Sequence, residues 1–492
     1  MKEKKAPVKW ILFVLFLAVA SLSVYRTYRI LSWKDTMGPF MSSADQFYNT
    51  EKGLIDAAFF GSSHGYAGVR PGVIWKDYGY ATFNFSVSGQ DKISTVHYIR
   101  ELLKRHTPQV VFVDLYATEY ERHGVLSNMY RNMLSLRLSP NQISLINAYY
   151  PKEERMNYYL KWPIIHTRYR ELQPYDFYDS PVNRYGRGAD YSFRNDDTYL
   201  KQSVTSVPGA MEASESNQAF IDDLAEIQNE TGVTVIPVVL PFIAMEETQR
   251  MLNGIMQYAE EKGLTCIDFN QMYDELELIT EVDFADWGHL NSYGAEKVSR
   301  WLGAYLQEHF TIPDHRGDAA YWQWDEDVLY EEHALFKKQL GDTSKWSPFA
   351  NAAAEGEELV ILLCLPEGFG DQKNQVEKTA ELLGLPEDFA ANGGVCIIDD
   401  GVVNINMPLQ EEGSGSYDID RRHTVWAEGK KAFDTELSTG EVSMRMVWQL
   451  GMGTEVLFDS DQAEGMGVIV YDKRMEAVIY RKTFAYSELY IF

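Results

Sequence analysis

Between residues 54 and 310, short apolar runs alternate with helical patterns, and this alternation constrains the fold more than any other feature of the chain. The runs are rich in β-branched and aromatic residues and lie at residues 54–61, 81–89, 109–116, 233–242 and 264–270. Apolar residues recur at helical spacing in residues 93–106, 246–263 and 292–307. Strands that are apolar along nearly their whole length are typical of a parallel sheet covered on both faces. We therefore predict an α/β domain over residues 50–310, with its functional residues beyond the carboxyl ends of the strands.

A long insertion, about residues 116–214, separates the third and fourth predicted strands. It is rich in tyrosine, and five arginines alternate with aromatic residues in it: Arg168, Arg170, Arg184, Arg187 and Arg194. Such a segment could line a groove for a sugar or an anionic polymer through stacking and charge together. The alternative is a surface subdomain whose arginines pair with the chain's own carboxylates. The sequence leaves both interpretations open.

The character of the chain changes after the predicted α/β domain. Residues 311–358 are acidic and are interpreted as a linker that contains one connecting helix. Residues 359–492 are predicted to form a β-rich α+β accessory domain, with a strand at 359–365, a helix at 372–385 and a hairpin at 394–407 that turns at Asp400-Gly401. Further strands are predicted within residues 442–448, 454–458, 467–472 and 476–484.

The first 30 residues carry a targeting pattern. Four lysines precede a continuous apolar run at residues 11–24, and a charged flank before an apolar core is the pattern of an export signal. We expect an uncleaved signal anchor, a single membrane helix with the bulk of the chain on the extracytoplasmic side. Cleavage after Ala18-Val19-Ala20, which would release a secreted protein, is the alternative.

Charge and cysteine content narrow the class of partner. The formal net charge of −27 argues against a nucleic-acid partner, which would need a large basic surface. The three cysteines, Cys266, Cys364 and Cys396, lie far apart and are interpreted as buried core residues. The ten histidines include no HExxH motif and no paired Cys/His spacing, so we expect neither a metal site nor a cofactor.

Two separated blocks could supply a serine nucleophile and its base. Ser62 and Ser63 follow the first predicted strand, at its carboxyl end. A serine hydroxyl needs a general base within hydrogen-bond reach and a third group that orients the base. Asp286 and His289 lie three residues apart just before the last helix of the domain, so a turn can hold the carboxylate against one imidazole nitrogen. The other nitrogen could then take the proton from Ser63.

Each of these residues also has a simpler interpretation. The two serines could cap the helix that follows them, and Asp286 could cap a helix entry beside a surface His289. Their occurrence together with the glycine loop at Gly89 favours the catalytic interpretation. His64 is expected to be structural or to face the substrate, and Asp91 is expected to cap the helix after the Gly89 loop.

The blocks FFGSSHGYAG, NFSVSGQ and DWGHLNSYGA, in this order, resemble the SGNH/GDSL hydrolase superfamily over roughly residues 55–310. The resemblance implies a flavodoxin-like three-layer sandwich in which Ser63 is the nucleophile and Ser62 replaces the usual acidic residue. It implies that Asp286 and His289 are the acid and base, and that the N–H groups of Ser63 and Gly89 form the oxyanion hole.

One block departs from the family pattern. The third strand is followed by DLYATEY, which lacks the usual asparagine. An oxyanion hole without one donor loses roughly 3 kcal/mol of transition-state stabilisation unless Tyr116 or Thr118 substitutes.

The export signal and the Gly-Ser-Ser block are similar to exported SGNH-like proteins of wall and exopolysaccharide acylation, including D-alanyl-lipoteichoic acid biosynthesis and alginate O-acetylation proteins. With KAFDTEL at residues 431–437 and GMGVIVYDKRMEAVIYRKTF at residues 465–484, the C-terminal part resembles interleukin-like EMT inducer (PANDER-like) domains, which implies a carbohydrate-associated binding module.

Two functions therefore remain open. One is an extracytoplasmic esterase or O-acyltransferase that acts on an acylated polysaccharide or wall polymer, beside a membrane-bound O-acyltransferase. The other is a non-catalytic partner that binds polysaccharide within a membrane acylation or export complex. The missing asparagine favours the second function, and the serine, histidine and aspartate favour the first.

Overall fold

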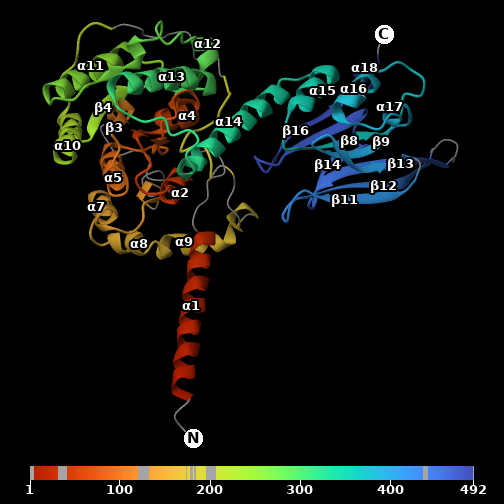
Figure 1. Ribbon diagram of the computed structural model, residues 1–492, viewed down its shortest axis with the longest axis horizontal. Helices are drawn as coiled ribbons and strands as arrows, with labels where there is room; N and C mark the ends of the chain where they lie inside the picture. The colour runs from red at the N-terminus through yellow and green to blue at the C-terminus, as the bar shows by residue number, and fades with distance from the viewer. Residues whose placement is uncertain are drawn as a thin grey trace. The chain divides into compact units, whose positions relative to one another are not determined.

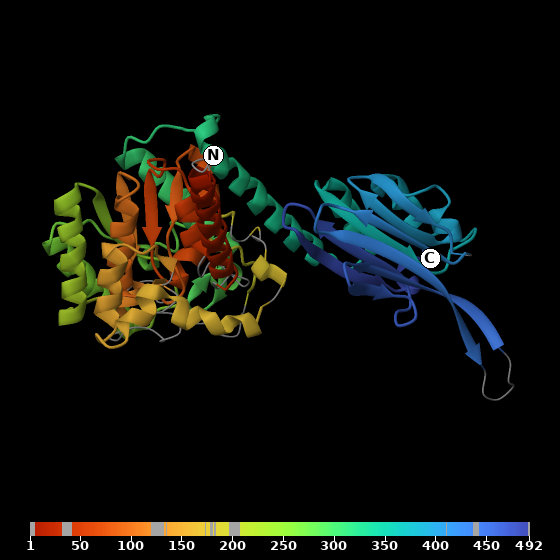
Figure 2. The same cartoon turned by 90° about the horizontal axis from the view of Figure 1, so that it is seen from below.

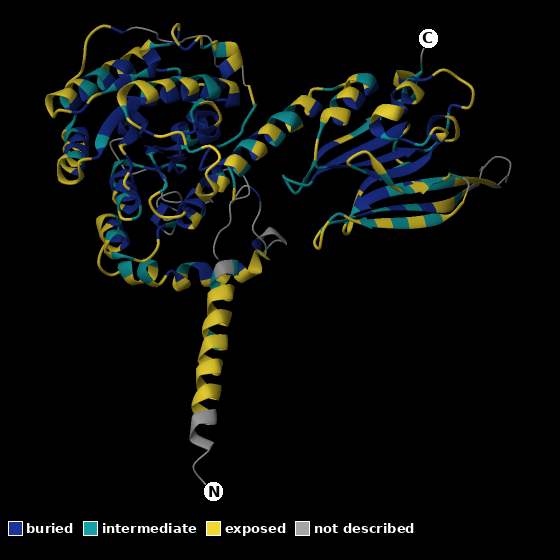
Figure 3. Cartoon of the chain, viewed as in Figure 1, coloured by how far each residue is buried: buried dark blue, intermediate teal, exposed yellow. Residues whose placement is uncertain are grey.

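The computed structural model describes residues 5–31, 42–119, 132–133, 135–172, 174–177, 181, 184–195, 207–409, 411–435 and 442–490. These residues form two compact units, Met1–Glu331 and Glu332–Phe492. Unit 1 begins with the long helix α1 (Lys5–Leu31), which is apolar and exposed (Figure 1, Figure 3). By length and composition, residues Lys9–Tyr28 of this helix are able to cross a membrane, either as an anchor or as a signal sequence.

Unit 1 is built on a five-stranded parallel sheet, as the sequence predicts. Its strands are β1 (Ala57–Phe60), β2 (Thr82–Asn84), β3 (Val110–Asp114), β4 (Thr234–Val239) and β5 (Ile267–Asp268). Their order is β2-β1-β3-β4-β5, and every neighbouring pair is parallel. This is the doubly wound order of flavodoxin-like folds, in which ligands bind beyond the carboxyl ends of the strands.

Helices cover both faces of this sheet, so the unit has three layers (Figure 1, Figure 2). One face packs against α5 (Lys92–Leu103), α10 (Glu215–Thr231) and α11 (Glu246–Glu261), and the other against α4 (Pro71–Tyr78) and α13 (Ser292–His309). Successive strand side chains point to opposite faces: Ala58 and Phe60 lie in the first core, and Ala57 and Phe59 lie in the second. Burial on both sides explains why the strands lack a polar alternation.

Shorter elements complete unit 1. They are α2 (Ser42–Asn49), α3 (Ser63–Gly68), η1 (Leu115–Glu119), η6 (Phe269–Gln271), α12 (Thr280–Asp283), β6 (Phe284–Asp286), β7 (His289–Leu290) and η7 (Ala319–Tyr321). The described part of the insertion forms α7 (Pro140–Tyr149), α8 (Arg155–Leu160), α9 (Trp162–Ile165), η2 (His166–Arg170), η3 (Pro174–Phe177) and an irregular segment at 184–195. The rest of the insertion lies outside the described residues.

Two arginines of the insertion form buried ion pairs inside unit 1. Arg168 pairs with Asp176 at 2.5 Å, and Arg187 pairs with Asp327 at 2.6 Å; all four side chains are buried. These two arginines fit the interpretation in which the insertion pairs with the chain's own carboxylates. The charges of both guanidinium groups are therefore balanced within unit 1.

Unit 2 contains two antiparallel sheets and a layer of helices. One sheet has the order β10-β9-β8-β15-β16, and the other has the order β11-β12-β13-β14. The strands are β8 (Leu359–Leu365), β9 (Gly394–Asp399), β10 (Val402–Met407), β11 (Gly413–Asp418), β12 (Thr424–Thr435), β13 (Val442–Met452), β14 (Glu455–Asp459), β15 (Met466–Asp472) and β16 (Ala477–Phe484). The helices are α15 (Trp346–Glu355), α16 (Gln375–Leu383), α17 (Phe389–Asn392) and α18 (Tyr486–Leu489).

The central strands of unit 2 are buried between helices and the second sheet. In β8, Ile361 and Leu363 pack toward the core that includes α15 and α16, and Leu362 and Cys364 pack toward β12 and β13. The predicted β9–β10 hairpin is confirmed. Its turn residues have φ values of 45° and 78°, as a primed turn requires.

The acidic segment 311–358 contains two helices, α14 (Trp322–Gly341) and α15. Trp346 and Phe349 of α15 are fully buried, and both rings contact Phe484 of β16. The part of this segment that the sequence indicates as a linker therefore contains a packed helix of unit 2.

Candidate active site

Ser63 lies at the turn between β1 and α3, beyond the carboxyl end of the strand. Glycines on both sides allow this turn to pack closely. A Cβ on Gly61 would lie 2.8 Å from the Cβ of Asp114 on β3, and a Cβ on Gly65 would lie 2.2 Å from Oγ of Ser86. The turn therefore fits against the ends of the two neighbouring strands only because both positions are glycine.

Asp286 and His289 lie at the turn of a two-stranded ribbon, β6 and β7, just before α13. Oδ1 of Asp286 accepts a hydrogen bond from the Gly288 N–H at 2.8 Å, and the same oxygen lies 2.8 Å from Nδ1 of His289. Nε2 of His289 lies 2.7 Å from Oγ of Ser63. The structure thus brings the three predicted side chains into one hydrogen-bonded row across 226 positions of sequence.

The charge arrangement in this row suits proton transfer. Burial raises the pKa of Asp286, but the hydrogen bond from His289, its charge and the Gly288 N–H outweigh this effect and hold the pKa below its usual value. An ionised Asp286 favours the tautomer in which Nδ1 carries the proton and Nε2 faces Ser63 as an acceptor. The side chains of His289 and Asp286 are about one-third exposed, at 32% and 33%, so reactants are able to reach the row.

His64, next to the serine, is fully buried. Its ring stacks on Tyr116 with centroids 3.4 Å apart and lies 5.1 Å from the ring of His289. Burial, and secondarily the charge of His289, lower the pKa of His64 well below its usual value. Within the described part of the chain neither ring nitrogen has a hydrogen-bond partner. His64 is therefore uncharged and packs behind the row of Ser63, His289 and Asp286.

Gly89 lies on the loop after β2 with a φ of 64°, a backbone conformation that glycine adopts without strain. This loop is tied to the Ser63 turn, because the Val87 N–H donates to the Gly61 carbonyl at 3.1 Å. From the insertion, Nδ2 of Asn132 donates to the Gly89 carbonyl at 3.3 Å. Sequence reasoning missed Asn132, since no local pattern links it to a loop more than 40 positions away.

Neither predicted substitute for the missing asparagine is free to act as one. The Thr118 hydroxyl donates to the Leu115 carbonyl at 2.5 Å. Tyr116 stacks on His64 and hydrogen-bonds to Glu119. Both side chains are thus engaged within or beside η1.

The helix-cap interpretation differs in outcome between Ser62 and Asp91. Ser62 occupies the cap position of α3 but makes no capping hydrogen bond, and its hydroxyl is buried without a partner in the described residues. Asp91 caps α5, accepting from the Ser94 N–H at 2.8 Å as predicted. The cap interpretation therefore holds for Asp91 and does not account for the Ser62 side chain.

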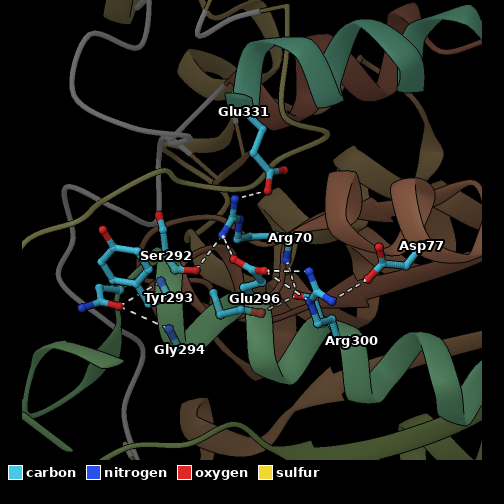
Figure 4. Close-up of polar contacts among 11 residues, drawn as sticks. Arg70, Asp77, Ser292, Tyr293, Gly294, Glu296, Arg300 and Glu331 are labelled. Atoms are coloured by element: carbon cyan, nitrogen blue, oxygen red, sulfur yellow. Dashed lines mark hydrogen bonds and ion pairs between the residues drawn. The ribbon is translucent and has the colours of Figure 1, made fainter. Parts of the chain in front are cut away.

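Arg70 ties the segment before α4 to α13 and to Glu331 (Figure 4). It lies two residues after the end of α3 and directly before α4, and it is buried. Its Nη1 donates to the Ser292 carbonyl at 2.7 Å and lies 3.6 Å from Glu296, both on α13. Its Nη2 pairs with Glu331, and its backbone N–H donates to Oγ of Ser299 at 2.8 Å.

The start of α13 is fixed by a second set of contacts (Figure 4). Asn291 caps the helix, with its Oδ1 accepting from the N–H groups of Tyr293 and Gly294 at 3.0 and 3.2 Å. Arg300 pairs with Glu296 at 2.9 Å and with Asp77 of α4 at 3.4 Å. The helices that follow Ser63 and His289 are thus held together. The sequence signal for Arg70 is a single charged residue within an otherwise apolar run, which sequence reasoning passed over.

Asp190, from the insertion, lies beside the row and was also missed. Its N–H donates to the Tyr66 carbonyl of α3 at 2.9 Å, and the nearby Ser192 carbonyl accepts from the Ser292 N–H at 2.7 Å. Burial raises the pKa of Asp190, while the Tyr191 N–H and the charge of His289 partly oppose this rise. The insertion therefore adds a second carboxylate to the surroundings of His289.

No protein-family model matches this chain, and no curated protein matches it. Among the described residues, no group of three or more His, Cys, Asp or Glu side chains is arranged to hold a metal ion. The described cysteines are free thiols, with Cys364 and Cys396 buried.

Proposed function

We propose that this chain is a membrane-anchored extracytoplasmic serine esterase or O-acyltransferase of the SGNH type. It acts on acyl groups of a cell-wall or extracellular polysaccharide. One observation carries the proposal: Ser63, His289 and Asp286 form a hydrogen-bonded row with steps of 2.7 and 2.8 Å beyond the carboxyl end of β1.

In the proposed mechanism, Oγ of Ser63 attacks the acyl carbonyl carbon while Nε2 of His289 takes its proton. Asp286 stabilises the imidazolium, and the N–H groups of Ser63 and Gly89 donate to the oxyanion. The tetrahedral intermediate collapses when the bond to the leaving alcohol breaks and His289 returns the proton to it. Water or a sugar hydroxyl then attacks the acyl-enzyme, again with His289 as base.

The apolar helix α1 supports location at the membrane. Residues Lys9–Tyr28 satisfy the length and composition of a span, and they follow a lysine-rich flank. We propose that α1 is an uncleaved anchor with the lysines inside and both units outside. The resemblance to exported acylation proteins suggests a membrane-bound O-acyltransferase as partner.

A second candidate function is a weakly active or inactive partner that binds polysaccharide. The engagement of Tyr116 and Thr118 favours it, because no substitute third oxyanion donor comes from either side chain. The loss would be roughly 3 kcal/mol of transition-state stabilisation.

Labelling with a fluorophosphonate probe separates the two candidates. The full-length protein in detergent should react, Ser63→Ala should not, and Ser62→Ala, the neighbouring serine, should still be labelled, at a rate several-fold lower. Equal labelling of wild type and Ser63→Ala would reject Ser63 as the nucleophile. A wild type that fails to react would reject the enzyme proposal in favour of the binding role.

A further inference from the structure

The insertion presents an apolar outer surface at α8, α9 and the turns that follow them. The side chains of Met156, Leu160, Trp162, Tyr169 and Phe177 are 44–64% exposed. Met156 and Leu160 are four residues apart on α8 and share one face of it. We name these five side chains the interfacial platform. Several large apolar side chains exposed together mark an interaction surface.

Other side chains of the same segment are anchored in unit 1. Tyr158 and Tyr159 pack against the core beneath the sheet, and Ile165 is buried. Nζ of Lys161 donates to the Leu136 carbonyl at 2.8 Å. The segment is therefore fixed in place, so the exposure of the platform is not a consequence of loose packing.

The platform lies where the apolar helix ends. η2 and η3 contact α1, and Nη1 of Arg168 donates to the Ile30 carbonyl at 3.1 Å. The span itself covers Lys9–Tyr28, so this contact lies just beyond its end. Figure 1 shows α8 and α9 crosswise to α1 at that end. A surface in this position would meet the lipid headgroups if α1 crosses the bilayer.

The composition of the segment suits that environment. Of the five Lys or Arg in residues 150–172, Lys161 and Arg168 are buried, which leaves three basic residues against three Glu, so the segment is close to neutral in a chain whose net charge is −27. Tryptophan and tyrosine favour the membrane–water interface. Aliphatic side chains such as Leu160 contribute by entering the boundary with the acyl chains.

We propose that the interfacial platform rests on the outer leaflet of the bilayer that α1 crosses. Unit 1 is then held against the lipid surface in a fixed orientation by two attachments, the span and the platform. This inference rests on the anchoring part of the proposed function and is independent of the catalytic part.

The test uses nitroxide labels on the full-length protein in nanodiscs of equimolar phosphatidylcholine and phosphatidylglycerol. Three single substitutions, Met156→Cys, Met245→Cys and Leu17→Cys, report the platform, a matched exposed methionine and the span. Labelling of the parent chain gives the background from its own cysteines. Collision rates with oxygen, which partitions into lipid, and with a water-soluble nickel chelate are measured at each site.

We expect oxygen to be favoured several-fold over the nickel chelate at positions 17 and 156, and the reverse at 245. Lipid exposure at 17 with water exposure at 156 overturns the platform and leaves the anchor intact. Water exposure at 17 overturns the anchor itself. Shielding of 156 from both reagents overturns the lipid assignment in favour of a second copy of the chain.

Discussion

The central sheets of the two units are buried to the same extent. The units differ in the buried polar side-chain atoms near these sheets that lack a hydrogen-bond partner. β1 and β3 of unit 1 and β8 and β15 of unit 2 are buried along their whole length. In unit 1, however, several buried polar atoms near the Ser63 turn have no partner in the described residues: Ser62 Oγ, both ring nitrogens of His64, Ser86 Oγ, Gln90 Nε2 and Asp114 Oδ2. In the described part of unit 2, buried polar atoms without a partner include Trp448 Nε1 and Tyr471 OH.

This comparison indicates where buried polar groups without a partner lower the stability of the fold. A buried polar group without a partner costs about 1–3 kcal/mol. In unit 1 some of these groups lie around the turn at the carboxyl edge of the parallel sheet, beside the row of Ser63, His289 and Asp286, and others, such as Thr82 Oγ1 and both ring nitrogens of His106, lie elsewhere in the unit. Functional sites commonly depart from the rule that every buried polar group has a partner.

The largest expected effect is that of His289→Ala. Without the base, turnover of a short-chain nitrophenyl ester should fall at least about a thousandfold. The free energy of unfolding should change little, since the side chain is one-third exposed. Ester hydrolysis and urea titration measure the two quantities on the same protein. Unchanged turnover would remove His289 from the mechanism.

Asp114→Asn should have the next largest effect, on stability. Burial raises the pKa of Asp114 to about 7, so the folded chain keeps its proton where the unfolded chain has lost it. Stability is therefore lost as the pH rises from about 4 to 7, by up to roughly 3–4 kcal/mol. Asparagine stays neutral and should flatten this slope in urea titrations across that range. The exposed Asp371→Asn serves as control; a slope unchanged by Asp114→Asn would contradict the assignment.

Removal of an unpartnered hydroxyl from each unit sharpens the comparison. Ser62→Ala and Tyr471→Phe should each raise the free energy of unfolding by about 1 kcal/mol, because each deletes a buried group without a partner. Only Ser62→Ala should lower ester turnover several-fold, because Ser62 adjoins the nucleophile. Equal effects of the two variants on turnover would show that an unpartnered hydroxyl beside Ser63 matters no more for catalysis than one in unit 2.

The smallest expected effect is that of Asp190→Asn. The groups that face His289 are Asp286, Ser63, His64 and Asp190. Loss of the Asp190 charge should make the imidazolium less stable, so the acid limb of the kcat/KM profile should move to lower pH by about half a unit. A purely structural role would lower kcat without moving this limb.

Local patterns allowed much of this structure to be predicted. The five strands, the Asp91 cap and the Asp400-Gly401 turn follow from residues that lie next to one another. The positions of Ser63 and His289 follow from the rule that places both at the same edge of a parallel sheet.

Long-range contacts account for what could not be predicted. Arg70 and Asp190 matter because of what α13 and α3 bring near them, and their neighbours in sequence carry no sign of it. Likewise, the residues around Trp346 suggest a linker, and only their packing on β16 makes them a core helix. In both cases the decisive partner lies more than one hundred positions away.

The most direct test of the central claim is peptide mass mapping after a brief incubation of the full-length protein with the nitrophenyl ester and an acid quench. The account predicts one added acyl group on the peptide that contains Ser63, and none on that peptide from Ser63→Ala. An acyl group on the same peptide in Ser63→Ala, or only on another residue of the wild type, would contradict it.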